Sequence, residues 1–162
     1  MEMFDFSMDL PLRSEWGSVD LIRSSVESCF TAMYRDIDGC RTLAMIAGEL
    51  LENAIKYGDW TSSPNFLRLR IWGEDGQACV RVENPVDEAR SRVHELLETL
   101  AWIRTFPSAE DAYRARLIEV ATSRERSESK LGLVRIAYEG NCTITADRTG
   151  TGLRVTAQMP LG

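Results

Sequence analysis

The chain has 162 residues, of which 44% are hydrophobic and 27% are charged, and its formal net charge is -6. This length suits one domain with its own buried core, and the acidic balance argues against a nucleic-acid binder, which usually carries a basic face. No apolar run approaches the roughly 18 residues that a membrane span needs, and residues 1–10 contain no basic leader segment, so we expect a cytoplasmic protein.

Cysteine and histidine usage excludes two kinds of metal site. Cys29, Cys40, Cys79 and Cys142 form no C-x-x-C pair and stand among apolar neighbours, so we expect reduced core residues. The single histidine, His94, excludes a site built from a histidine cluster.

The first half of the chain predicts a strand, two helices and a pair of strands. Residues 3–9 alternate apolar and polar, as a half-buried strand does. Apolar residues recur at helical spacing over 18–35 and again over 41–57, with Asp38-Gly39 interpreted as the break between the two helices. Strict alternation then predicts strands over 66–72 and 78–82.

The second half returns to helical periodicity after a turn. Glu74-Asp75-Gly76 is typical of a hairpin connection. Helical spacing follows over 87–104 and 109–122, and the polar residues 123–130 predict a mobile loop before a short helix over 132–139.

A second hairpin closes the chain, with strands over 141–147 and 152–159 joined at Arg148-Thr149-Gly150. Five strands with helices gathered on one face predict an α+β sandwich. Because no repeat, linker or low-complexity tract interrupts residues 1–162, we expect one domain.

A polar pair stands on the helix predicted over 41–57. Glu49 and Asn53 are four residues apart, so they stack one turn above the other at the margin of the apolar face. A carboxamide oxygen suits Mg²⁺, and a carboxylate one turn earlier can accept the proton of a group that attacks a γ-phosphate. A Glu–Asn hydrogen bond without function is the alternative.

The segment Glu49-Leu-Leu-Glu-Asn53-Ala-Ile-Lys56-Tyr57-Gly58 resembles the N-box, E-x-x-x-N-A, of the GHKL (histidine-kinase-like) ATPases. The resemblance implies that Glu49 is a general base and that Asn53 ligates the Mg²⁺ of bound ATP. It also implies that Lys56 approaches a phosphate, with a solvated Lys56–Glu52 pair as the alternative. The order of elements matches too, which implies a two-layer α/β sandwich with a mixed sheet of about five strands.

Other motifs of this superfamily are incomplete. The usual D-x-G-x-G after the second hairpin strand is replaced by residues 82–87, VENPVD, where Asn84 either contacts adenine or merely ends the strand. The lid motif G-x-G-L is reduced to Gly132 and Leu133, and Lys130 stands where a glycine is expected. A helix that begins at Gly132 would still direct free N–H groups at an anion. Lys130 is either a phosphate contact or a solvated loop lysine.

Thr151, within Thr149-Gly150-Thr151-Gly152, resembles the terminal G-T-G element that lies near the nucleotide in this superfamily. A plain hairpin turn is the alternative.

These departures together resemble a GHKL subgroup that includes SiaB-type protein kinases, relatives of the anti-sigma-factor kinases. The resemblance implies a serine/threonine protein kinase of bacterial partner switching that uses ATP and Mg²⁺ on a small STAS-like partner. The alternative is a catalytically inactive module that sequesters a response regulator, sigma factor or antagonist. A sensor histidine kinase is disfavoured because His94 is isolated. Met3, Phe4 and Phe6 either form the apolar edge of a homodimer or pack into the domain's own core.

Overall fold

The computed structural model describes residues 4–11, 17–60, 66–86, 92–123, 131–150 and 152–161. Five strands lie within these ranges: β1 (Asp5–Pro11), β2 (Phe66–Glu74), β3 (Gln77–Pro85), β4 (Thr143–Thr149) and β5 (Gly152–Pro160). Five helices lie there too: α1 (Gly17–Met33), α2 (Ile37–Tyr57), α3 (Val93–Ile103), α4 (Ala109–Thr122) and α5 (Gly132–Glu139). Residues 87–91 of the predicted 87–104 helix and residues 124–130 of the predicted loop lie outside the described residues.

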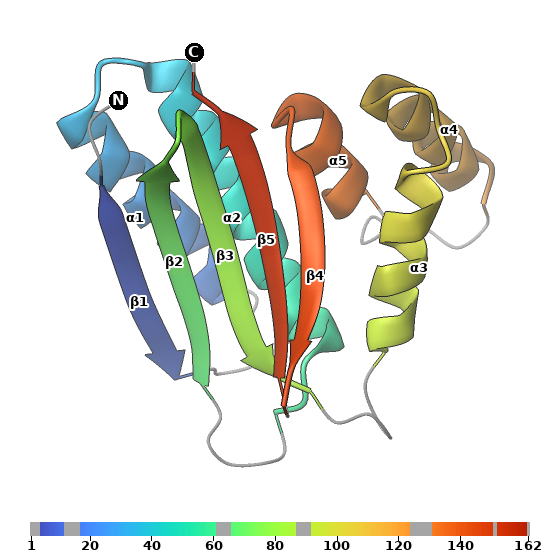
Figure 1. The fold of residues 1–162 in the computed structure, drawn as a ribbon, viewed down its shortest axis with the longest axis horizontal. Helices are drawn as coiled ribbons and strands as arrows, with labels where there is room; N and C mark the ends of the chain where they lie inside the picture. Colours follow the sequence, from blue (N-terminus) through green and yellow to red (C-terminus); the bar gives the residue numbers. More distant parts are fainter. Residues whose placement is uncertain are drawn as a thin grey trace.

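The strands form one sheet in the order β1-β2-β3-β5-β4, and helices α1, α2 and α5 cover one of its faces (Figure 1). Helices α3 and α4 extend this helical layer past the β4 edge. The two-layer α/β sandwich is therefore confirmed. The expected mixed sheet is wrong in one respect, because all four strand pairings are antiparallel. Strands β3 and β4 run in the same direction, but β5 lies between them, so no parallel pair forms.

The strand alternation assigns apolar residues to the helical layer and charged residues to the open face. In β2, Leu67, Leu69 and Ile71 are fully buried, whereas Arg68 and Arg70 lie on the opposite face. One row of charges alternates in sign across the whole open face. Its members, paired strand to strand, are Asp9, Arg68, Glu83, Arg154 and Asp147. A one-residue slip of any strand would break this row and expose the core, so both features fix the register.

Helix α2 is the centre of the core and begins earlier than the sequence indicated. Its N-cap is Asp36, whose carboxylate accepts a hydrogen bond of 3.0 Å from the backbone N–H of Gly39. The residues Asp38 and Gly39, predicted to separate two helices, therefore lie in the first turn of α2. The cap outweighs the low helix propensity of a glycine near the end of a helix.

The turn between β2 and β3 has the predicted form. Glu74 pairs with Gln77, so Asp75 and Gly76 form a two-residue loop with φ angles of 50° and 73°. Two positive φ angles are typical of the type I′ turn, which suits the twist of the strands that it joins.

The aromatic residues near the N-terminus pack inward. The ring of Phe30 lies 5.3 Å from that of Phe4 and 6.5 Å from that of Phe6, and Tyr34 adjoins the same cluster. Core packing is therefore confirmed for Phe4 and Phe6, whereas Met3 lies outside the described residues. All four cysteines are free, with Cys40 and Cys79 buried. Among the helices of the described ranges, none combines the length and apolarity of a membrane span.

Candidate functional site

The site lies where α2 packs beside α5, and it brings together two motifs that are far apart in the sequence. Glu49 comes from the middle of α2, and Gly132 is the first residue of α5. A Cβ atom added to Gly132 would lie 2.6 Å from Oε2 of Glu49. Only a glycine at this position leaves room for the carboxylate to lie against the beginning of α5 as it does. The structure thus brings together Glu49 and Gly132, and the catalytic and nucleotide-binding roles expected of them stay predictions.

An arginine that the sequence did not single out binds Glu49. Nη1 of Arg135 donates a hydrogen bond of 3.0 Å to Oε1 of Glu49, and Nε of Arg135 donates one of 3.0 Å to Glu139. The Glu49 side chain is 17% exposed and that of Arg135 is 40% exposed. Burial raises the pKa of Glu49, and the charge and hydrogen bond of Arg135 offset this only in part. The signal in the sequence that could have identified Arg135 is a charged residue between apolar neighbours, one turn after Gly132.

Asn53 lies one turn further along α2 and has an unsatisfied polar atom. The residue is 6% exposed, and its Nδ2 has no hydrogen-bond partner among the described residues. Buried polar groups in proteins nearly always have a partner, and an unpaired one costs about 1–3 kcal/mol. A half-turn of the amide would present its oxygen instead of its nitrogen at the same point. Asn53 therefore fits a site that holds a water molecule or a ligand.

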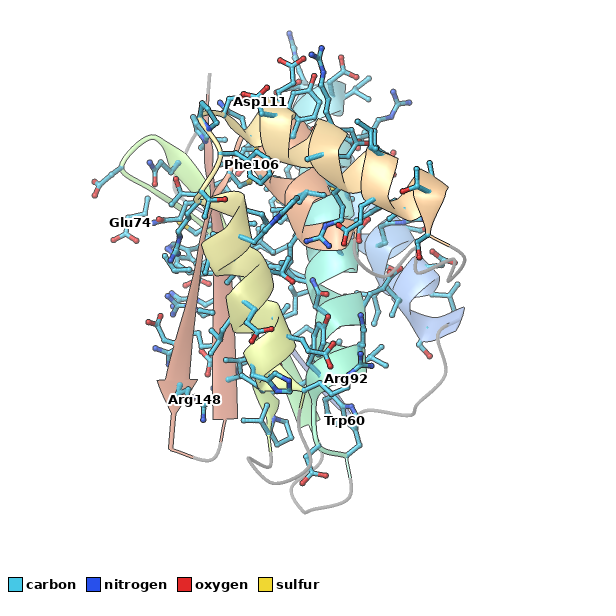
Figure 2. All side chains as sticks on the ribbon, turned by 90° about the vertical axis from the view of Figure 1, so that its right-hand side faces the viewer. Trp60, Glu74, Arg92, Phe106, Asp111 and Arg148 are labelled. Carbon is cyan, nitrogen blue, oxygen red and sulfur yellow. The ribbon has the colours of Figure 1, made fainter. Side chains whose placement is uncertain are left out.

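A cavity of about 480 Å³ opens between α2, α3 and α4, one turn beyond Asn53. Figure 2 looks onto this side of the molecule, with Arg92 at one end of α3 and with Phe106 and Asp111 where α3 gives way to α4. Eight residues line the cavity: Lys56, Tyr57, Glu95, Glu98, Thr99, Trp102, Arg116 and Glu119. Three carboxylates face two cations, so phosphate groups are disfavoured inside it. The lining includes the predicted residue Lys56 but neither Glu49 nor Asn53.

Arg116 is a second residue that sequence reasoning missed. Its guanidinium lies 4.1 Å from the ring centroid of Trp102, and its Nη1 pairs with Glu119 at 2.9 Å. The side chain is 9% exposed, and its Nε has no hydrogen-bond partner among the described residues. Arg116 stands four residues after the buried Ala112, so both residues lie on one face of α4. A charged residue at this spacing from an alanine is the signal in the sequence that could have identified Arg116.

The remaining predicted residues divide into those that the structure places and those outside its described ranges. Asn84 is buried at the end of β3, where its side chain donates a hydrogen bond of 3.2 Å to the carbonyl of Pro85. This bond suits the strand-ending interpretation, and an adenine contact stays a prediction. Leu133 is buried in the first turn of α5. Lys130 and Thr151 lie outside the described residues.

The junction of α2 and α5 fits a magnesium–nucleotide complex in two respects. Asn53 has a buried Nδ2 without a partner among the described residues, and Gly132 lets the Glu49 carboxylate lie against the beginning of α5. Leu131, the N-cap residue of α5, gives no side-chain cap, so the side chain of that residue does not occupy the first N–H groups of this helix. The adjoining cavity fits less well, because its lining is acidic.

Comparison with known proteins supports the fold and assigns no family. No family model matches the chain. Over 137 residues the sequence is 28% identical to UvrABC system protein B of Prochlorococcus marinus (strain MIT 9301). That match covers 85% of this chain, but the chain spans only 17% of the length of that relative. An identity this low over so small a part of the relative does not define a family.

A structural relative covers almost the whole chain. A chain in the crystal structure of the SiaB–SiaC complex from Pseudomonas aeruginosa matches this fold with a TM-score of 0.70 at 16% sequence identity. The match covers 95% of this chain and 88% of that chain. The protein therefore shares its overall fold with a component of that complex.

Proposed function

We propose that this chain is an ATP- and Mg²⁺-dependent serine/threonine protein kinase that acts on a small partner protein in bacterial partner-switching signalling. The observation that carries the proposal is the contact of the Glu49 carboxylate with Gly132, with Asn53 one turn further along α2, where its Nδ2 has no partner among the described residues. A candidate base lies against the first residue of α5, and a candidate metal ligand stands one turn further along α2. This combination suits phosphoryl transfer better than it suits a purely structural helix contact.

In this proposal each residue of the junction has a separate task. The oxygen of Asn53 would hold Mg²⁺, and the N–H groups at the beginning of α5 would orient the phosphates. Bound Mg²⁺ would neutralise part of the phosphate charge. Glu49 accepts the proton of the partner's hydroxyl as the bond from that oxygen to the γ-phosphorus forms and the bond from the γ-phosphorus to ADP breaks.

The structural relative and the sequence motifs support a proposal for the partner. The structural relative is part of a two-protein complex named SiaB–SiaC, and the sequence motifs resemble those of SiaB-type kinases. We propose that the partner of this chain is a small STAS-like or response-regulator protein, bound in the cytoplasm. A homodimer of this chain stays a prediction.

Incubation with ATP, Mg²⁺ and candidate STAS-like partners tests the proposal through the phosphate incorporated into the partner. Glu49→Gln should reduce the rate about 10²- to 10⁴-fold, the usual contribution of a general base. Glu52→Gln is the matched control, because Glu52 stands on the same helix while the three atoms nearest to a Cβ on Gly132 all belong to Glu49, and it should retain activity. Equal labelling by the wild type and by Glu49→Gln would show that Glu49 is not the base.

A second candidate function is supported by the ion pair between Glu49 and Arg135 and by the acidic cavity beside Lys56. In this alternative the chain has lost catalysis and regulates a signalling partner by binding alone. Calorimetry with Mg-ATP separates the two functions. A dissociation constant weaker than about 1 mM, or about -4 kcal/mol, together with retained binding of the partner, would favour the binding module.

A further inference from the structure

Arg135 connects the candidate base to a second carboxylate. Its Nη1 bonds to Glu49 and its Nε bonds to Glu139, each at 3.0 Å. These two bonds use two of the five N–H donors of a guanidinium, and the side chain is 40% exposed, so further donors can reach an arriving ligand. The bond to Glu139 holds Arg135 in place independently of Glu49.

The position of Arg135 is suited to an anion. Arg135 stands three residues after Gly132, so both residues share one face of α5 at its uncapped beginning. Asn53 lies on the adjoining helix, one turn after Glu49, and its Nδ2 has no partner among the described residues. An anion that enters this junction meets helix N–H groups, an amide and a guanidinium. The opposing charges that contact the guanidinium are those of Glu49 and Glu139, and the guanidinium already neutralises each of them in part.

We propose that Arg135 recognises the terminal phosphate of the nucleotide and that it exchanges its bond to Glu49 for a bond to that phosphate. This inference rests on the proposed function and adds the regulation of its base. A guanidinium binds carboxylates and phosphates through the same planar fork of donors, and a terminal phosphate carries more charge than a carboxylate. The exchange would release Glu49 to accept a proton only when a nucleotide with a terminal phosphate is bound.

The same exchange accounts for the incomplete lid motif. A glycine-rich lid brings backbone N–H groups close to phosphates, and this chain retains only Gly132 from that motif. A guanidinium that reaches from the first turn of α5 can supply donors in their place. If Arg135 were only a structural link between α2 and α5, its removal would change stability and not the discrimination between nucleotides.

Calorimetric titration of Mg-ATP and Mg-ADP into four proteins tests the inference: the wild type, Arg135→Gln, Glu49→Gln and the double variant. Arg135→Gln should reduce the preference for ATP over ADP by about tenfold or more, since it removes a charged hydrogen bond to the terminal phosphate. Glu49→Gln should tighten ATP binding, because the carboxylate no longer competes for Arg135. In the Arg135→Gln background the same Glu49→Gln change should have no effect on ATP affinity.

Controls separate binding from folding. Arg41→Gln removes an arginine from the same protein at an exposed site near the beginning of α2, paired with Glu27 and Asp38, and should leave both affinities unchanged. Arg135→Lys keeps the positive charge but loses the planar set of N–H donors of a guanidinium. Its preference for ATP over ADP should therefore lie between those of the wild type and Arg135→Gln. Thermal melts establish that each variant is folded.

The outcomes distinguish this inference from the proposed function. Nucleotide binding with an unchanged ATP-to-ADP ratio in Arg135→Gln would overturn the role of Arg135 alone. An equal effect of Glu49→Gln with and without Arg135 would overturn the exchange. Absence of binding of either nucleotide to the wild type would overturn the proposed function, and this inference with it.

Discussion

Glu49 and Gly132 meet across the interface of α2 and α5, where Oε2 of Glu49 lies 2.6 Å from the point that a Cβ on residue 132 would occupy. Gly132 is not among the residues with positive φ, so its small size and not its backbone freedom is what the site uses. The retention of this one glycine, when the other lid glycines are missing, has a steric cause. The contact places the carboxylate at the end of a helix whose N–H groups have no side-chain cap.

Gly132→Ala is predicted to reduce phosphate transfer while leaving the stability of the fold almost unchanged. The added methyl must displace the Glu49 carboxylate, which is the flexible end of a side chain, so the fold should survive while the base moves away from the beginning of α5. We expect phosphate transfer to the partner to fall by about 10²-fold, comparable to the loss of a positioned base. Thermal denaturation should show a change of less than about 1 kcal/mol, because alanine is a better helix former than glycine.

Gly48→Ala is the control for that prediction. Gly48 precedes Glu49 on α2, and a Cβ there would lie 3.1 Å from Cδ of Arg23, a half-exposed side chain that can move aside. We expect unchanged phosphate transfer and a gain in stability of about 0.5–1 kcal/mol from helix propensity. Equal loss of activity in both variants would show that the contact of Glu49 with Gly132 has no special role.

Glu49→Gln is predicted to make the stability less dependent on pH. Burial raises the pKa of Glu49 above its ordinary value of 4.5, and Arg135 and Arg23 oppose this shift while Glu139 adds to it. Because the folded protein holds this proton more tightly than the unfolded chain, the contribution of Glu49 to stability is lost as the pH rises through its folded pKa. A glutamine at position 49 does not ionise, so the variant loses no stability from a buried charge as the pH rises. Arg135 keeps its bond to Glu139 in this variant.

Melting temperatures of the wild type and Glu49→Gln, measured from pH 4 to pH 8, test this. At pH 8 the variant should melt about 2–4 °C higher, the shift that about 1 kcal/mol causes in a domain of this size. The difference should shrink as the pH falls toward 4, where Glu49 takes up its proton in the unfolded chain as well. A wild type that is more stable than the variant at pH 8 would mean that the ion pair with Arg135 outweighs the cost of burial.

The sheet and its hairpins follow from local sequence patterns, because alternation and turn residues act over a few positions. Asp75-Gly76 forms the expected turn, and residues 132–139 form the expected short helix. The beginning of α2 was missed because the cap at Asp36 outweighs the helix-breaking tendency of Gly39. A cap is a single hydrogen bond that periodicity does not reveal.

The sequence predicted only some residues of the candidate site, and the reason is not the one that applies to the beginning of α2. Glu49 and Asn53 stand one turn apart, so their alignment follows from helix geometry alone. The partner of Glu49 comes from another helix, and only the packing of α5 against α2 brings Arg135 within 3.0 Å. The same holds for Arg116, whose contact with Trp102 depends on how α4 lies against α3. Contacts of this kind are set by tertiary packing and not by local spacing.

The turn between β2 and β3 gives a prediction for the fold alone. Gly76 has a φ of 73°, a conformation that costs an ordinary residue about 1–2 kcal/mol, so Gly76→Ala should lower the melting temperature by several degrees. Asp75→Asn is the control, since asparagine adopts positive φ readily and should leave the melting temperature unchanged. Phosphate transfer by both variants should match the wild type, because the turn lies away from the junction of α2 and α5. A stable Gly76→Ala variant would contradict the type I′ turn.

Asn53→Leu is predicted to stabilise the protein and, under the proposed function, to abolish its response to Mg-ATP. Leucine has nearly the shape of asparagine, and it would replace a buried amide whose Nδ2 has no partner among the described residues. Removing an unsatisfied buried polar group should raise the free energy of unfolding by about 1–3 kcal/mol, measured by urea denaturation. If the amide binds a metal–nucleotide complex, the same change should remove the increase in melting temperature that Mg-ATP gives the wild type.

Asn53→Asp serves as the matched control, since a carboxylate can still ligate Mg²⁺ but is costly to bury without it. We expect this variant to be less stable than the wild type and to regain part of that loss on addition of Mg²⁺ alone. A buried amide that was retained only for packing would show the opposite pattern: Asn53→Leu would lose stability, and Mg²⁺ would leave Asn53→Asp unchanged. Asn53 would then belong to the core of α2, and the metal ligand of the proposed kinase would have to be sought elsewhere.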